Sequence, residues 1–84
     1  MTYTYTPRGV CSQRMEFELD GDRIVSLRVI GGCDGNLKGL SSLLAGMPVD
    51  EAIARLSGIR CGGKNTSCPD QIARALRQYR DARA

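Results

Sequence analysis

The chain contains no histidine and no tryptophan, and it has a single phenylalanine among its 84 residues. Without an imidazole, the Ser/His/Asp and Cys/His catalytic arrangements are excluded, because histidine is the proton carrier in both. With so few large aromatic side chains, and with only about 60 to 65% of the unfolded surface buried in a chain of this length, the core is small. We therefore expect a metal or a cross-link to add stability.

Long apolar runs are also missing. No segment approaches the roughly 18 apolar residues of a membrane span, and the stretch from Met1 to Arg8 lacks the apolar centre of a secretory leader. We therefore expect a cytoplasmic protein with no membrane partner. Because structural disulfides are uncommon in a reducing compartment, the cysteines are better interpreted as metal ligands or redox groups.

The formal net charge is +3, and four arginines recur every three residues near the end of the chain. Nucleic-acid sites that stack bases need aromatic side chains among the basic ones, and these are nearly absent here. We interpret the arginines as the solvated face of a helix and expect no nucleic-acid partner. They are Arg74, Arg77, Arg80 and Arg83.

Alternation with period two predicts two half-buried strands in the first half of the chain. Between them Asp20 and Gly21 form the pair that a tight hairpin turn favours. Residues 3–5 also alternate and predict a third strand. The apolar positions of the two longer strands are Met15, Phe17 and Leu19, and then Val25, Leu27 and Val29.

In the second half of the chain the apolar residues recur at helical spacing. We predict a first helix behind the N-cap Asn36 up to Gly46, a second from Pro48 to Gly58, and a third from Cys68. Strands followed by helices predict one α+β domain over residues 1–84, with a small antiparallel sheet of about three strands and three helices packed on one face. The expected buried positions are Leu37, Leu40, Leu43 and Leu44, then Val49, Ala52, Ile53 and Leu56, then Ile72, Ala75, Leu76 and Tyr79.

Four cysteines lie in or next to loops rich in glycine: Cys11, Cys33, Cys61 and Cys68. None forms a CxxC pair, which argues against a zinc ribbon and against a thioredoxin-like dithiol. A shared site must be assembled by folding, with four thiolates as ligands or with a carboxylate such as Asp34 beside Cys33. Thiolate ligands favour zinc first and an iron-sulfur cluster second.

Two other functions fit the same residues. In a redox-active dithiol protein Cys61 and Cys68 would exchange, since a thiolate at the start of a helix is favoured by the helix dipole. In a partner-binding module without chemistry the basic C-terminal helix and an exposed sheet edge would recruit a protein, and each cysteine would be a small buried hydrophobe. The glycines at 31, 32 and 35 also suit an anion-binding turn, although neither GxGxxG nor a P-loop sequence is present.

Two motifs carry a resemblance to a known family. The run from Gly32 to Gly39, and Cys61-Gly62 followed by Thr66-Ser67-Cys68-Pro69-Asp70, resemble the TSCPD domain family, as does the stretch from Gly9 to Ser12. The resemblance covers nearly the whole chain and is greatest to small stand-alone members with four cysteines.

Similar domains occur at the C-terminal end of adenosylcobalamin-dependent ribonucleotide reductases. The resemblance therefore implies an accessory role in deoxynucleotide synthesis, with a ribonucleotide reductase as a protein partner. It does not imply an autonomous enzyme, because 84 residues cannot supply the catalytic barrel of a reductase.

A more distant resemblance connects the chain with the iron-sulfur-cluster assembly scaffold proteins. Those proteins place three cysteines and an acidic residue on converging loops, and the matching positions here are Cys33, Asp34, Cys61 and Cys68. Cys11 has no counterpart among them. This resemblance implies that the matching loops converge, and it leaves open whether Cys11 belongs to the same site.

Overall fold

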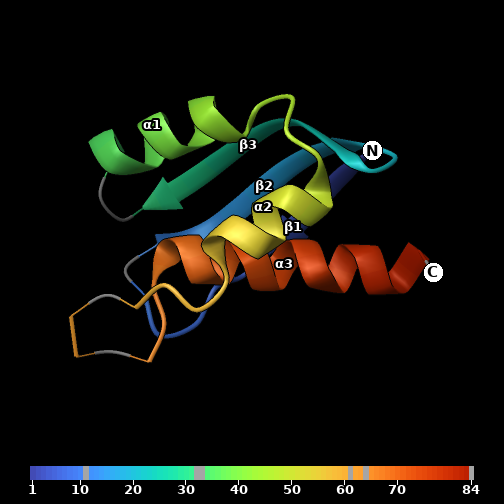
Figure 1. Ribbon diagram of the computed structural model, residues 1–84. Helices are drawn as coiled ribbons and strands as arrows, with labels where there is room; N and C mark the ends of the chain where they lie inside the picture. The colour runs from blue at the N-terminus through green and yellow to red at the C-terminus, as the bar shows by residue number, and fades with distance from the viewer. Residues whose placement is uncertain (11, 32–33, 61, 64, 84) are drawn as a thin grey trace.

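The computed structural model of the protein describes residues 1–10, 12–31, 34–60, 62–63 and 65–83. It confirms the predicted α+β class, in which a three-stranded antiparallel sheet is followed by three helices (Figure 1). The elements are β1 (Thr2–Tyr5), β2 (Ser12–Asp20), β3 (Arg23–Gly31), α1 (Asp34–Leu44), α2 (Val49–Leu56) and α3 (Cys68–Arg83).

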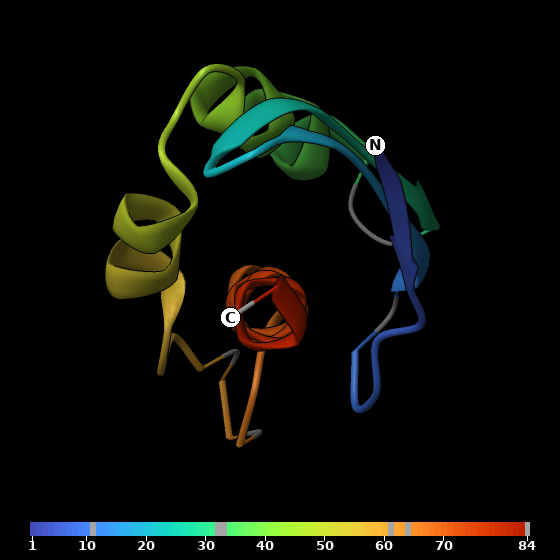
Figure 2. The same ribbon diagram turned by 90° about the vertical axis from the view of Figure 1, so that its right-hand side faces the viewer.

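The sheet has the strand order β1-β2-β3, and both pairs are antiparallel. The predicted hairpin is confirmed: β2 ends at Asp20, β3 begins at Arg23, and Gly21 takes the positive φ of 60° that the turn requires. Figure 2, which looks along α3, shows the sheet curving around this helix. The concave face of the sheet is therefore the side that carries the core.

The strand β2 buries Met15, Phe17 and Leu19 as predicted, with exposed fractions of 0, 0 and 1%. The prediction for Val25 is wrong, because its side chain is 51% exposed while that of Ile24 is fully buried. The register explains the difference. Glu18 pairs with Ser26 but Leu19 pairs with Ile24, so Val25 is an extra residue on β3 and the alternation reverses there.

The two later helices bury the residues that their spacing predicts. All four apolar positions of α2 are buried, and Ile72, Ala75 and Leu76 of α3 are fully buried in the same core. Tyr79 is also buried, and its hydroxyl donates to the Gly21 carbonyl oxygen at 2.7 Å. This bond holds the second half of α3 against the hairpin.

The helix α1 lies alongside β3, and two details of its prediction need correction (Figure 1). It begins at Asp34, so Asn36 lies inside the helix and is not its N-cap. Leu43 is 74% exposed, whereas Leu37 and Leu44 are buried. At 100° per residue Leu43 lies about 120° around the helix from Leu37, so contact with one strand cannot bury both.

Arg77 and Arg80 connect α3 to α2. Arg77 donates to the Ser57 hydroxyl at 3.0 Å, and Arg80 pairs with Asp50 at 3.1 Å. Both partners belong to or directly follow α2. Arg74, Arg77 and Arg80 are themselves exposed, as expected for the solvated face of a helix. None of the helices in the described part of the chain combines the length and the hydropathy that crossing a membrane requires.

A matched pair of leucine substitutions tests which side chains of α1 and α3 are buried. Leu76→Ala removes a fully buried side chain and should lower the free energy of unfolding by about 2 to 5 kcal/mol. Leu43→Ala removes an exposed side chain and should change it by less than about 0.5 kcal/mol. Urea denaturation measures both values, and an equal cost for the two substitutions would show that the orientation of α1 is wrong.

Candidate functional site

The start of α3 is built by the residue that precedes it. The hydroxyl of Ser67 accepts a hydrogen bond from the Asp70 amide at 3.1 Å, and the Ser67 carbonyl accepts from the Gln71 amide at 2.9 Å. The same hydroxyl donates to the carbonyl oxygen of Ile59 at 2.6 Å. Ser67 is thus the N-cap of α3, and it places Cys68 as the first residue of the helix.

Asp70 is the buried acid of the site, with an exposed fraction of 5%. Its carboxylate accepts hydrogen bonds from the Thr66 hydroxyl at 2.5 Å and the Gly58 amide at 2.8 Å, and it pairs with Arg74 at 3.1 Å. Burial raises the pKa of Asp70, but the bonds from Thr66 and Gly58 and the charge of Arg74 outweigh it, so the pKa lies below its ordinary value. Asp70 is therefore ionised and ties Gly58 to the helix.

Gln71 makes a second set of connections from the same helical turn, and it is 2% exposed. Its Oε1 atom accepts hydrogen bonds from the Tyr5 hydroxyl at 3.2 Å and from the Arg8 amide at 3.1 Å, while Nε2 donates to the Thr66 hydroxyl at 3.0 Å. Gly9 lies against the same threonine, and a Cβ atom there would come within 3.2 Å of the Thr66 methyl group. The segment before β2 is thus held against the start of α3.

The side chain of Cys68 contacts the start of β2. Its Sγ atom lies 3.2 Å from the hydroxyl oxygen of Ser12, which is 4% exposed. Ser12 in turn pairs with Gly31, the last residue of β3. The start of β2, the end of β3 and the start of α3 therefore meet at one end of the molecule, as Figure 1 shows.

Only one of the predicted ligands has a described side chain. Cys11, Cys33 and Cys61 lie outside the described residues, Asp34 is the first residue of α1, and Cys68 is a half-buried free thiol. Within the described ranges, no group of three or more Cys, His, Asp or Glu side chains is close enough together to hold a metal ion. The four-cysteine site remains a prediction.

The hydrogen-bond network around Cys68 was not predicted from the sequence. Asp70 and Thr66 entered the sequence analysis only as part of the family motif, and Gln71 was not among the expected buried positions. The available signal was the presence of several polar residues next to the predicted start of the third helix, since serine, threonine and aspartate in such positions often bond to nearby backbone. The partners of Gln71 are 63 and 66 residues away, and no local pattern indicates them.

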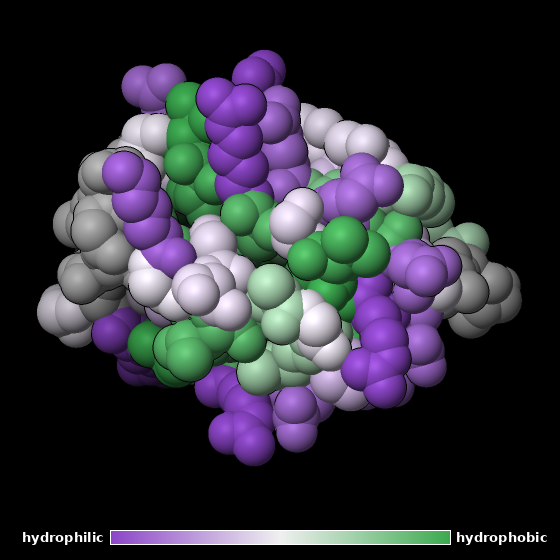
Figure 3. Space-filling model, turned by 90° about the horizontal axis from the view of Figure 1, so that it is seen from above, coloured by the Kyte–Doolittle hydropathy of each residue, from purple (hydrophilic) through white to green (hydrophobic). Residues whose placement is uncertain are grey.

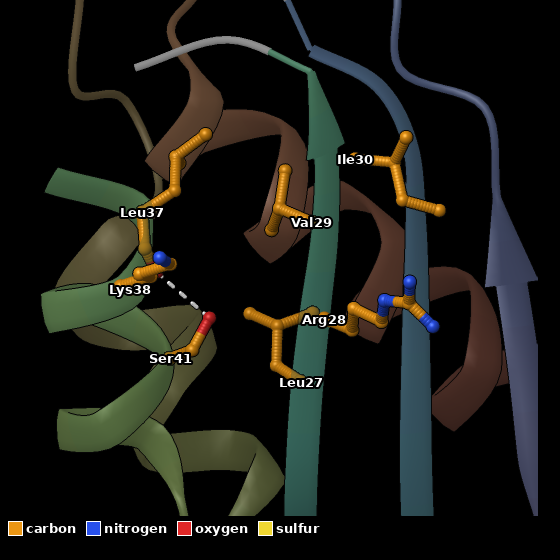
Figure 4. A pocket seen from close by; sticks show the side chains of 7 residues that line it. All are labelled: Leu27, Arg28, Val29, Ile30, Leu37, Lys38 and Ser41. Atoms are coloured by element: carbon orange, nitrogen blue, oxygen red, sulfur yellow. Dashed lines mark hydrogen bonds between the residues drawn. The ribbon is translucent and has the colours of Figure 1, made fainter. Parts of the chain in front are cut away.

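A separate hollow of about 440 Å³ lies between β3 and α1. Figure 4 shows Leu27 and Val29 of β3 facing Leu37 of α1 across it, with Lys38 and Ser41 on the helix side. Figure 3, which views the molecule from above relative to Figure 1, shows hydrophobic surface interrupted by hydrophilic side chains. None of the described residues that line the hollow takes part in the network around Cys68.

A curved antiparallel sheet closed on one long helix, with a buried polar network beside a cysteine, defines a small cysteine-bearing α+β domain. The chain belongs to the TSCPD domain family, whose sequence model matches residues 1–80 of the 84. The matched range contains the positions of all four cysteines and of the network residues. A comparison with curated proteins finds no match, and neither does a comparison with solved structures.

The pH dependence of stability tests the charged state of Asp70. Because its pKa is lowered in the folded protein, its stabilising effect is present above its unfolded pKa of about 3.9 and is lost as the pH falls through the folded pKa. Asp70→Asn should therefore lower the free energy of unfolding by about 1 to 3 kcal/mol near neutral pH. The difference from wild type should shrink in acid.

Urea denaturation of both proteins between about pH 7 and pH 3 measures this difference, with a chelator present so that bound metal does not contribute. A difference that stays constant over this range would contradict an ionised Asp70.

Proposed function

We propose that the protein is a metal-binding domain that holds one zinc ion through Cys11, Cys33, Cys61 and Cys68. The observation that supports this proposal is the meeting of the described residues that flank the cysteines in sequence. Ser12 lies against Cys68, Ser12 pairs with Gly31, and Ser67 bonds to the carbonyl of Ile59.

Covalent geometry connects these contacts to the cysteines. The first cysteine directly precedes Ser12, the second follows Gly31 by two residues, and the third follows Ile59 by two residues. One residue spans about 3.8 Å and two span at most about 7 Å, so these sequence distances are short enough for the proposed shared site. The contact of its neighbour Ser12 with Cys68 supports including Cys11 in the proposed site.

The set of donors suits zinc. Without histidine, the residues that can ligate a soft cation are the thiolates, and four thiolates around zinc form a closed structural site. The same ligands would hold an iron-sulfur cluster, which is the second choice. Asp34, the first residue of α1, is the carboxylate that would replace a thiolate. A structural metal would stabilise the small core.

The proposed role is structural or accessory, without an autonomous enzymatic reaction. Membership of the TSCPD domain family supports a link to ribonucleotide reduction through the resemblance described above, with a ribonucleotide reductase as the partner. The alternative function is a redox-active dithiol protein in which Cys61 and Cys68 exchange.

Metal analysis of untagged protein purified without oxygen tests the proposal. We expect about one zinc ion per chain, and each Cys→Ser substitution should reduce the content and the thermal stability together. Ser26→Cys is the matched control, because it adds a thiol at an exposed position of β3 and should leave one ion per chain. A content below about 0.2 metal ions per wild-type chain would contradict the proposal.

If metal-free protein instead formed a Cys61–Cys68 disulfide reversibly near cellular potentials, the redox alternative would replace the metal proposal. Mass spectrometry after thiol trapping measures which cysteines pair.

A further inference from the structure

We infer that Asp70 and Gln71 are positioning residues that hold two different cysteine-bearing segments against the start of α3. The inference rests on the proposed metal site, because it concerns how the predicted ligands are brought together. Neither side chain is a ligand in it. Each acts through the backbone that it binds, and the two segments are 50 or more residues apart along the chain.

The Gln71 amide holds the segment that leads to Cys11. Its oxygen accepts two hydrogen bonds, from the Tyr5 hydroxyl and from the Arg8 amide, three residues before this cysteine. At 2% exposure the side chain lies in a place where an apolar residue would pack without needing partners. Its hydrogen bonds fix the position of the segment before Cys11, so we infer that the polar side chain has a positioning role.

The Asp70 carboxylate holds the segment that leads to Cys61. One of its oxygens accepts from the Gly58 amide at 2.8 Å, three residues before that cysteine, while Ser67 bonds to the next carbonyl along the chain, that of Ile59. Arg74 neutralises the carboxylate at 3.1 Å. This segment is therefore fastened at two successive residues.

Thr66 connects the side chains of Asp70 and Gln71. Its hydroxyl donates to Asp70 at 2.5 Å and accepts from the Gln71 side chain at 3.0 Å, and the residue is 8% exposed. A hydroxyl that donates to one side chain and accepts from another makes a continuous chain of hydrogen bonds. Substitution of Asp70 or Gln71 should therefore also loosen the segment that the other residue holds, but to a smaller extent.

Zinc affinity measured by competition with a chromophoric chelator tests the inference. Gln71→Met keeps the volume and removes the polar atoms, and Asp70→Ala removes the carboxylate. Each should weaken zinc binding by about 10- to 100-fold, as outer-shell substitutions do, while one ion still binds at saturation.

Tyr79→Phe is the matched control. It removes a buried hydrogen bond of the same helix at the end far from Cys68, where Tyr79 donates to Gly21, and it should leave zinc affinity unchanged. A loss that followed stability alone would appear in this control as well.

Two further variants keep the test decisive if a substituted protein folds poorly. Tyr5→Phe removes one of the hydrogen bonds to Gln71 and should weaken zinc binding in the same direction by a smaller factor. Asp70→Asn keeps an oxygen for the Gly58 amide and should bind zinc more tightly than Asp70→Ala.

Amide hydrogen exchange identifies which of the two segments has been loosened. The Arg8 amide should exchange faster in Gln71→Met, and the Gly58 amide should exchange faster in Asp70→Ala. Folded variants that bind zinc as tightly as wild type would overturn the inference and leave the metal proposal standing. Wild-type protein that binds no metal would overturn the proposed function itself.

Discussion

The end of the molecule that carries Cys68 depends on a buried, ionised carboxylate. A charge out of water is tolerated only with hydrogen-bonding partners, and Asp70 has three, from Gly58, Thr66 and Arg74. Two of these partners precede α3 in the chain, so the charge determines how the connection from α2 returns to the helix. The position of Asp70 in the first turn adds the favourable field of the helix N-terminus.

The helix α3 links this polar end to the apolar core. Its later turns bury Leu76 and Tyr79 inside the curved sheet, while its first turn carries the network. The ring of Tyr79 packs edge-on against Tyr3 of β1 at 5.7 Å between ring centroids. Because one rigid helix takes part in both regions, packing in the core determines where Cys68 lies relative to Ser12.

Much of the fold was predictable because its elements bury one regular face each. The stripes of α2 and α3 and the alternation of β2 follow directly from helical and strand periodicity. The exceptions are local departures from that regularity. The extra residue at Val25 reverses the alternation of β3, and contact with one strand leaves Leu43 of α1 exposed. The candidate site was less predictable, since Gln71 finds its partners near the other end of the chain.

The sequence by itself determined the chemistry that is open to the protein: no histidine, four cysteines outside CxxC pairs, and strands followed by helices. It also placed the chain in its family through motifs that span nearly its whole length. Only the tertiary structure decided which segments meet. The contact between Ser12 and Cys68 joins residues 56 positions apart, and it exists because the sheet curves around α3 and brings the start of β2 to the start of the helix.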